Sequence, residues 1–465
     1  MDGRPCLDWR GWDALKDAVP TAIPEAVQRN HLLILSPDRS GLLVKMHANL
    51  GYLLPTLVTA VGRKVLPLVK DHLDQLRIQP SSIVSLASRD STPEGCFDTA
   101  HLIETRSTSS VGNELEWKII PDLLKTPALW SVQRDFLYEY ASIAASLSVP
   151  SSPRFIGYHG WTTDLRNWAG AAAIKAGLGA IKGFVPFRAS RVEAVVVFQT
   201  DARRSIYVKC FAPLPFTEAL VTRALGELYP ECVAKTLDYC AERGWWAAEE
   251  VIGPSLGEHL TMEDCLGAIG RFTRMQKELA GCHAIFAEMG LRQLRLREID
   301  REIDATVAGL DEVSALSFSE LSGLSSLLSK ATAALAELDF PESLIHGDLT
   351  PWNIKMSGQG PVFLDWEDAA WGPAIVSLEI FLAALRNPQM QLRDSGWLER
   401  IRDSYLAAWG PIDPRWEDPK VSRYSRTLAL FCQLRGYLRC WRDEPDVLRG
   451  RDNVVQAARR LHQLL

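Results

Sequence analysis

The chain has 465 residues, 47% hydrophobic and 23% charged, which is the composition of a globular protein with more than one core. Lys and Arg number 51 against 57 Asp and Glu, a net charge of -6, and no basic run marks a nucleic-acid surface. Because the sequence has neither a membrane-length apolar segment nor the apolar core of a signal peptide, we expect a cytoplasmic protein without nucleic-acid or membrane partners.

Residues 1–150 have the pattern of an N-terminal α/β domain. The run HLLILSPDRSGLLVKMH (31–47) predicts a hairpin, because two apolar stretches flank a polar turn. Apolar residues at helical spacing predict a helix from Leu57 to Leu76, which Pro67 is expected to kink or split. Strands are predicted at SSIVSLAS and TAHLIETR. Pro and Ser in SVPSSPR (148–154) indicate a linker, so the first boundary is placed after residue 150.

Residues 151–252 are predicted to form a second unit. A helix is expected over 163–183 until its glycines end it, followed by a hairpin in RVEAVVVFQTDARRSIYVKC whose second strand ends on Lys209. An amphipathic helix over about 215–229 comes next, and then a strand in WWAAEEVIGPSL that a Gly-Pro turn ends. Residues 253–465 are predicted to be largely helical, apart from the strands that carry two motifs.

The two motifs are LIHGDLTPWNI (344–354) and VFLDWEDAAWGP (362–373). Each begins with an apolar, strand-like run, and together they deliver Asp348, Asn353 and Asp365 from strand ends. Two carboxylates and an amide are suited to bind a divalent cation and to accept a proton. Neither acid alone would be informative, because acids often cap turns, but the combination indicates a site.

The order of these features resembles the aminoglycoside phosphotransferase and choline kinase-like family, a small-molecule branch of the protein-kinase-like fold. The features are a hairpin with a lysine, a helix with an acid, a hinge, H-G-D-x-x-x-x-N, and a strand that ends in Asp. The resemblance covers residues 180–465. It implies an α+β, bilobal fold with an N-lobe at 151–252 and a helical C-lobe at 253–465, to which residues 1–150 add a further α/β domain.

The resemblance also implies roles at the motif residues. Asp348 would be the base that deprotonates the acceptor hydroxyl, while Asn353 and Asp365 would bind Mg²⁺ beside the phosphates of ATP. Asp365 stands where related kinases carry the D-F-G aspartate, here in D-W-E. His346 is interpreted as structural.

Lys209 would contact the α- and β-phosphates and be held by an ion pair to an acid of the following helix. Glu218 is the first choice for that acid and Glu227 the alternative. A solvated first-turn acid that complements the helix dipole is the competing interpretation of Glu218.

The remaining nucleotide contacts are predicted from position. Ser190, in VPFRASRVEA between two strands, is preferred to the glycine-rich GLGAIKG (177–183) as the phosphate-covering loop. Adenine would lie at the hinge near Glu249 and Glu250, and Gly253 would permit the turn into the helical lobe. The chain departs from the family at Ser377, where an Asp usually anchors the catalytic loop.

The leading hypothesis is an ATP- and Mg²⁺-dependent phosphotransferase acting on a small-molecule hydroxyl. Tryptophans and acids around the second motif favour an aminoglycoside, amino sugar, sugar or choline-like acceptor. The alternative is a catalytically silent nucleotide-binding or scaffold protein, which Ser377 and the missing glycine loop motivate. Protein kinase activity is disfavoured, because no activation-loop segment follows Asp365.

The N-terminal domain loosely resembles the Nudix fold. In that family a helix carries a metal-binding R-E-x-x-E-E-x-G cluster, whereas the equivalent stretch here, VLPLVKDHLDQLRIQP, has only Asp71 and Asp74. A catalytically empty module is therefore expected, and an unrelated α/β cap is the equal alternative.

Overall fold

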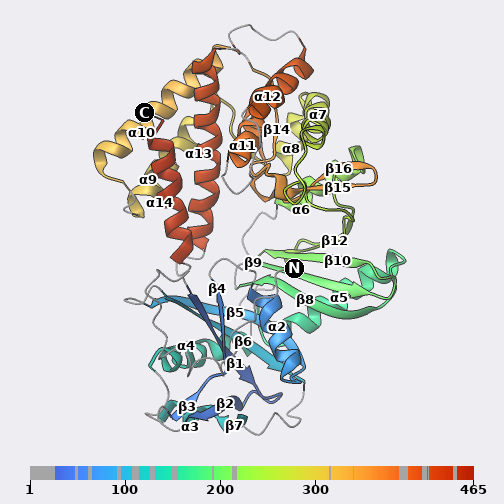
Figure 1. Cartoon of the computed structure of the whole chain (residues 1–465), viewed down its shortest axis with the longest axis vertical. Coiled ribbons are helices and arrows are strands. Elements are labelled where there is room, and N and C mark those ends of the chain that lie inside the picture. Colours follow the sequence, from blue (N-terminus) through green and yellow to red (C-terminus); the bar gives the residue numbers. More distant parts are fainter. Residues whose placement is uncertain are drawn as a thin grey trace. The chain divides into compact units, whose positions relative to one another are not determined.

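The computed structural model describes the chain in segments between residues 27 and 464 (Figure 1). Their contacts divide them into two compact units. Of the described residues, unit 1 takes those up to 211, 237–248 and Leu448, and unit 2 takes 217–236, 249–443 and 449–464. The described segments are 27–47, 51–60, 65–91, 96–106, 115–125, 131–148, 156–190, 193–211, 217–313, 316–338, 340–386, 396–410, 416, 418–443 and 448–464.

Unit 1 begins with a seven-stranded sheet of order β3-β2-β1-β6-β5, in which β4 also pairs with β1 and β7 with β2. The predicted hairpin is confirmed, because β1 and β2 pair antiparallel, whereas β1 and β6 are parallel. The strands are β1 (Val27–Leu35), β2 (Gly41–His47), β3 (Gly51–Leu53), β4 (Thr56–Ala60), β5 (Pro80–Ser91), β6 (Cys96–Thr105) and β7 (Leu115–Ile119). The helices of this region are α2 (Val65–Gln75), α3 (Ile120–Lys125) and α4 (Ser131–Ser148).

The helix predicted from Leu57 to Leu76 is wrong in its first part. Leu57 and Ala60 belong to β4, which pairs antiparallel with β1, and α2 begins only at Val65. A short apolar run fits a strand and a helix equally well, and here pairing with β1 decides. Pro67 lies in the first turn of α2, where its missing N–H breaks no helical hydrogen bond, so α2 continues to Gln75.

The second sheet of unit 1 has five strands in the order β11-β12-β10-β9-β8. The predicted second hairpin forms, although β10 continues to Phe211, so that Lys209 lies inside the strand instead of at its end. One hydrophobic core packs both sheets, from Leu32 to Trp245. The elements are α5 (Trp161–Lys175), β8 (Ile181–Ala189), β9 (Glu193–Thr200), β10 (Ser205–Phe211), β11 (Thr236–Cys240) and β12 (Trp245–Glu249).

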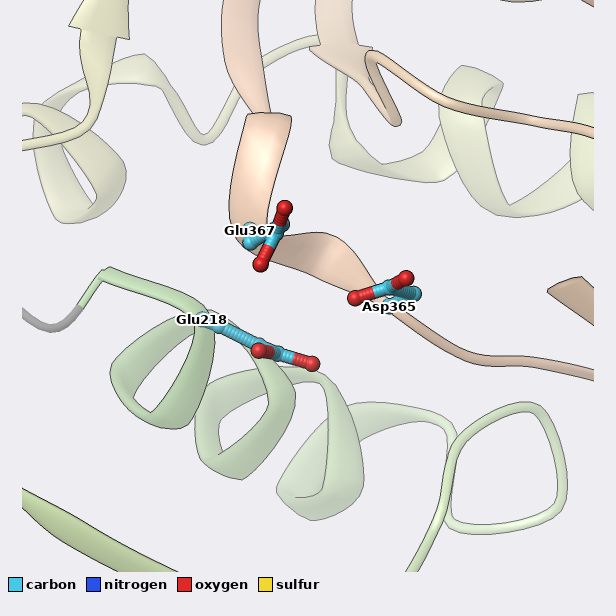
Figure 2. Close-up of side chains that lie close together, drawn as sticks. All are labelled: Glu218, Asp365 and Glu367. Carbon is cyan, nitrogen blue, oxygen red and sulfur yellow. The ribbon is translucent and has the colours of Figure 1, made fainter. Parts of the chain in front are cut away.

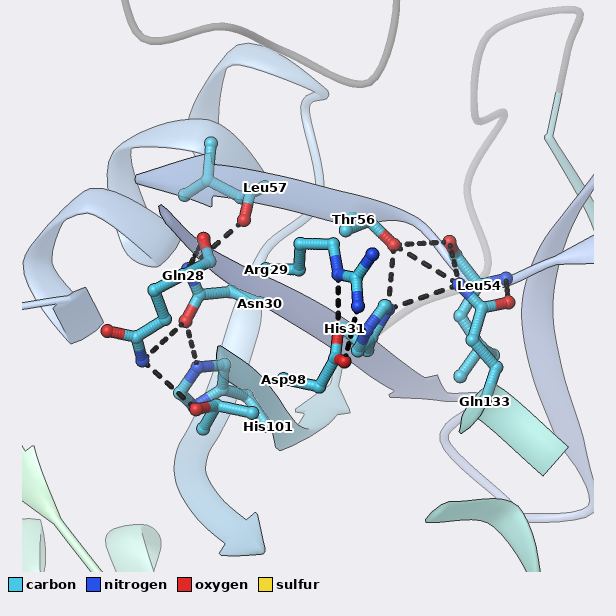
Figure 3. Close-up of polar contacts among 11 residues, drawn as sticks. Gln28, Arg29, Asn30, His31, Leu54, Thr56, Leu57, Asp98, His101 and Gln133 are labelled. Atoms are coloured by element: carbon cyan, nitrogen blue, oxygen red, sulfur yellow. Dashed lines mark hydrogen bonds and ion pairs between the residues drawn. The ribbon is translucent and has the colours of Figure 1, made fainter. Parts of the chain in front are cut away.

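A buried polar network joins β1 to β6 in the first sheet (Figure 3). On one face, Arg29 donates to both carboxylate oxygens of Asp98 at 2.6 Å, and His31 Nε2 lies 2.8 Å from Asp98. On the other face, His101 Nε2 lies 3.0 Å from Asn30 Oδ1. Because a buried polar group without a partner is costly, this pattern fixes how the two strands pair.

Unit 2 is mainly helical, and in Figure 1 α9, α10 and α13 lie side by side. Its strands form a three-stranded sheet of order β13-β17-β14 and the two-stranded sheet β15-β16. The strands are β13 (Arg292–Gln293), β14 (Glu342–Ile345), β15 (Ile354–Ser357), β16 (Gly360–Phe363) and β17 (Ala370–Pro373). The helices are α6 (Thr217–Leu228), α7 (Met262–Leu279), α8 (His283–Glu288), α9 (Asp300–Glu312), α10 (Phe318–Ala336), η2 (Pro351–Asn353), η3 (Trp366–Asp368), α11 (Ile375–Leu385), α12 (Gly396–Trp409), α13 (Pro419–Asp443) and α14 (Leu448–His462).

The predicted fold class is confirmed as α+β with an additional N-terminal sheet domain. The Nudix-like character of that domain stays a prediction; Asp71 and Asp74 are both exposed on α2. The domain boundaries at 150 and 252 also stay predictions, and residues 149–154 of the expected linker lie outside the described segments. Among the described helices, none has both the length and the apolar character that a membrane span requires.

Candidate active site

The first motif forms a loop that leaves the buried strand β14 and returns through η2. Asn353 Nδ2 donates to the backbone oxygen of Asp348 at 2.9 Å and to its carboxylate Oδ2 at 2.8 Å. One side-chain amide therefore closes the loop and orients the carboxylate. Because the amide nitrogen is used in this way, the amide oxygen of Asn353 remains the atom suited to a cation.

The second motif places Asp365 two residues after the end of β16, in a left-handed backbone conformation with φ of 68°. Non-glycine residues rarely adopt this region, and they do so most often where the surroundings hold a functional side chain in place. Leu364 N donates to the backbone oxygen of Asn353 at 2.9 Å, which links the two motifs immediately before Asp365. The structure therefore brings together the three residues predicted from the motifs.

Three acids from two elements gather beside this loop, as Figure 2 shows. Glu218, in the first turn of α6, and Asp365 and Glu367 each offer a carboxylate oxygen within 4.8 Å of the others. Three carboxylates this close repel one another unless a cation or donors lie among them, and hard oxygen ligands suit Mg²⁺. The group fits the divalent cation that the motifs predict.

Glu218 is buried, which argues against its interpretation as a solvated first-turn acid. Glu227, the alternative partner for Lys209, has a side chain that is 74% exposed and lies 3.9 Å from Arg223 Nε. Lys209 belongs to unit 1 and Glu218 to unit 2, so their ion pair stays a prediction. Glu367 was not predicted as a metal ligand; its signal in the sequence is the D-x-E spacing within D-W-E.

Ser377 accounts for the missing family aspartate. It lies buried in α11, and its Oγ accepts a hydrogen bond from the backbone N–H of His346 at 3.1 Å. From α7, Gln276 Nε2 donates to the Leu344 and Ala374 carbonyls at 2.8 and 3.2 Å. A hydroxyl thus supplies an acceptor at the start of the loop that carries Asp348 without burying a charge.

His346 and Gly347 support the loop from inside. Burial lowers the pKa of His346 to about 4, only partly opposed by Asp365, and its ring packs on Trp366 with centroids 4.4 Å apart. A neutral, buried imidazole favours the predicted structural role. Gly347 has φ of 83°, and a Cβ there would lie 2.1 Å from the Asp368 carbonyl oxygen. The atom that a side chain at this position would meet therefore belongs to the backbone.

The residues predicted to bind the nucleotide are Ser190, Lys209, Glu249 and Glu250. Ser190 directly follows β8, and its Oγ donates to the Glu193 carbonyl at 3.1 Å. Glu249 ends β12, its carboxylate 3.7 Å from Lys235, and Glu250 follows it. Alternation along β10 points Lys209 away from the core that Val208 and Cys210 enter. Their nucleotide roles stay predictions.

Gly253 behaves as expected for a turn. Its φ is 140°, and a Cβ would lie 2.1 Å from the Met356 carbonyl oxygen. No side chain larger than hydrogen fits here without moving the backbone.

The aromatic residues near the second motif correct one prediction. Trp366 and Trp371 are 0% and 1% exposed, so they belong to the core and cannot face an acceptor. Trp352, between Asp348 and Asn353, is 53% exposed and is the one of the three that reaches the surface. Of these three tryptophans, only Trp352 could therefore contact a cationic or sugar-like acceptor.

Part of the sequence matches a known family of enzymes. Residues 214–419 match the profile of the phosphotransferase enzyme family. This part of the chain resembles that family. The match confirms the predicted family and the predicted class of enzyme, a small-molecule phosphotransferase.

The solved structures that resemble the chain include a putative aminoglycoside phosphotransferase from Ralstonia eutropha, at 14% identity and a TM-score of 0.42, covering 64% of this chain and 97% of that one. A choline kinase from Streptococcus pneumoniae matches at 11% identity and a TM-score of 0.47, covering 64% and 99%. A choline kinase from Cryptosporidium parvum matches at 10% identity and a TM-score of 0.47, covering 65% and 95%. A search of curated proteins finds no match.

Proposed function

We propose that this phosphotransferase moves the γ-phosphate of ATP, with Mg²⁺, to a hydroxyl group of a small molecule. The observation that carries the proposal is the pair of neighbouring arrangements in unit 2: Asp348 oriented by Asn353, and Asp365 grouped with Glu218 and Glu367. The first is suited to take a proton. The second is suited to hold a divalent cation.

In the proposed reaction, Asp348 accepts the proton of the acceptor hydroxyl. The hydroxyl oxygen forms a bond to the γ-phosphorus as the bond to the ADP oxygen breaks. Mg²⁺, when bound, supplies charge neutralisation at the phosphates. Asn353 and Asp365 would hold it, Lys209 would contact the α- and β-phosphates, and Ser190 would cover the phosphates.

The base of the nucleotide is proposed to bind along the main chain at Glu249 and Glu250. The proposed division of labour follows the predicted domains: 1–150 as the additional domain, 151–252 as the N-lobe and 253–465 as the C-lobe. Only η3 and Ala369 separate Asp365 from β17, which leaves no long platform for a peptide substrate and supports a small acceptor.

The test is ADP release from Mg-ATP with a panel of hydroxyl acceptors that includes aminoglycosides, amino sugars, hexoses and choline. Asp348→Asn keeps the shape of the side chain and removes the base, so we expect kcat to fall by about 100-fold or more. Asp403→Asn, at an exposed position of α12, is the matched control and should keep the wild-type rate. Asp365→Asn should raise the Mg²⁺ concentration needed for half-maximal rate.

Two outcomes would contradict the proposal. ATP binding without acceptor-dependent ADP release would favour the silent nucleotide-binding or scaffold alternative. Equal rates for Asp348→Asn and the wild type would remove Asp348 from the chemistry.

A further inference from the structure

The strand that leads into the first motif lies at the edge of its sheet. β14 is an outer strand in the order β13-β17-β14, so within the described segments the backbone groups on its free side need partners other than a strand. Gln276 of α7 donates through Nε2 to the Leu344 carbonyl at 2.8 Å. Just beyond the strand, Ser377 of α11 accepts from the His346 N–H at 3.1 Å. All four residues are fully buried, so these two side chains supply the partners that buried backbone groups require.

Gln276 also reaches the chain that follows the second motif. The same Nε2 donates to the Ala374 carbonyl at 3.2 Å, and Ala374 directly follows β17, the strand that comes after Asp365. The backbone oxygen of Gln276 accepts from Ser343 Oγ at 2.6 Å, which adds a second link between α7 and β14. In Figure 1, α7 lies beside both β14 and α12. One residue of α7 therefore ties the strand before Asp348 to the chain after Asp365.

Tyr405 of α12 holds this amide in one orientation. Its hydroxyl donates to Gln276 Oε1 at 2.9 Å, and both side chains are fully buried. Burial raises the pKa of Tyr405, so the hydroxyl keeps its proton. If the amide were turned over, its oxygen would face the carbonyl oxygens of Leu344 and Ala374, so these two acceptors allow only the orientation with nitrogen towards them. Both the nitrogen and the oxygen of the Gln276 amide are therefore engaged.

The placement of the two acids matters more to this reaction than their chemical identity alone. Phosphoryl transfer depends mainly on positioning and on charge stabilisation, and a displacement of about 1 Å can cost about 100-fold in rate. Asp348 and Asp365 come from separate strands, so their distance depends on what holds those strands together. The Gln276 amide does this through backbone carbonyls, with a network whose members are all buried and paired.

We propose that Gln276, held by Tyr405, is a positioning residue of the phosphotransferase. By tying β14 to the start of α11, it sets the distance between the carboxylate of Asp348, which takes the proton, and that of Asp365, which holds the cation. This inference rests on the proposed function and adds two residues outside both motifs to it. The alignment of the site thereby depends on α7 and α12 as well as on the motif loops.

The experiment measures kcat and the KM for ATP in the full-length chain, with the acceptor of the panel that the wild type turns over fastest. Gln276→Met keeps a side chain of similar length but removes the amide, and we expect kcat to fall by about 10- to 100-fold. The KM for ATP should stay within about 2-fold, because the lost interactions lie within the protein. Tyr405→Phe keeps the ring and removes the hydroxyl, so kcat should fall by about 3- to 10-fold, the range of one hydrogen bond.

A control variant separates alignment from stability. Leu324→Ala, at a buried position of α10, weakens the core of unit 2 without removing a hydrogen bond of the network, so the folded variant should keep the wild-type kcat. All rates are measured where urea denaturation shows each variant to be folded, and Tyr405→Phe decides if Gln276→Met does not fold. A wild-type kcat in Gln276→Met and Tyr405→Phe, or an equal fall in Leu324→Ala, would overturn the inference while leaving the phosphotransferase intact.

Hydrogen exchange tests the same network without an acceptor. If the wild type turns over no acceptor, the proposed function fails, and the exchange rates of backbone amides decide whether Gln276 holds the two segments. We expect faster exchange over 342–348 and 370–377 in Gln276→Met and in Tyr405→Phe, with exchange in α10 unchanged. Equal exchange over these segments in the variants and the wild type would overturn the inference.

Discussion

At the residue scale, Ser377 stands where the family usually has an Asp, and its contacts show what replaces that Asp. Its hydroxyl accepts a hydrogen bond from the backbone N–H of His346, a residue that is fully buried. Ser377→Ala should therefore lower the free energy of unfolding by about 1 to 3 kcal/mol, the cost of a buried unpaired donor. Ser319→Ala, at an exposed position of α10, is the control and should change it by less than about 0.5 kcal/mol.

Urea denaturation of both variants measures the difference. If Ser377→Ala were as stable as Ser319→Ala, the serine would not anchor the loop that carries Asp348. The loop would then depend on other contacts, such as the Gln276 amide bonds to the Leu344 and Ala374 carbonyls.

The residues of the site differ in how far sequence could predict them. Asp348, Asn353 and Asp365 lie within two short motifs whose local order carries the chemistry, so they could be found without a fold. The role of Glu367 beside Asp365 could not be predicted, because nothing in the local sequence shows that Glu218, on another element, lies beside it.

At the element scale, contacts between distant segments determine the features that the sequence pattern leaves open. Arg292 of β13 and Arg439 of α13 both contact Asp368, and this meeting depends on how those elements pack. Trp366 and Trp371 looked like surface aromatics beside acids, but η3 and β17 bury them. Leu57 was assigned to a helix because an apolar run is ambiguous until its pairing strand is known.

Glycine substitutions in two elements give opposite predictions. Gly347→Ala places a Cβ 2.1 Å from a carbonyl oxygen at a positive φ, so we expect it to destabilise unit 2 by at least about 2 kcal/mol and to abolish activity. Gly267→Ala, within α7 with nothing inside 4 Å of the added Cβ, should stabilise by about 0.5 to 1 kcal/mol.

Thermal unfolding of the two variants compares an equal gain of one methyl group in different surroundings. A wild-type melting temperature for Gly347→Ala would show that the loop can move away from Asp368.

At the scale of the whole molecule, both units contain buried histidines that stay neutral. Burial lowers the pKa of His101 in unit 1 to about 3 and that of His346 in unit 2 to about 4. Burial also lowers the pKa of His31, although Asp98 opposes the shift. In the unfolded chain these groups titrate near pH 6.5, so the unfolded state binds more protons than the folded state between that pH and the folded values.

The sign of the pH dependence follows from that difference. Stability is fully present above about pH 6.5 and falls as the pH falls towards the folded pKa values, by about 2 kcal/mol for each of His101 and His346 at pH 5. Asp98 acts at lower pH: burial opposes the change, but hydrogen bonds from His31 and Arg29 lower its pKa, so its contribution is lost only below about pH 4. The interval from pH 6.5 to 5 therefore reports mainly on the histidines.

The network in Figure 3 allows a direct test of this origin. In His101→Gln an amide can still donate to Asn30 but cannot titrate, so the loss of stability between pH 7.5 and pH 5 should be smaller than in the wild type by about 2 kcal/mol. His259→Gln, at an exposed position, should keep the wild-type loss. Urea denaturation at the two pH values measures both. The same loss in His101→Gln and the wild type would mean that acid weakens the chain elsewhere, whereas a smaller loss would place part of its acid sensitivity in the N-terminal sheet.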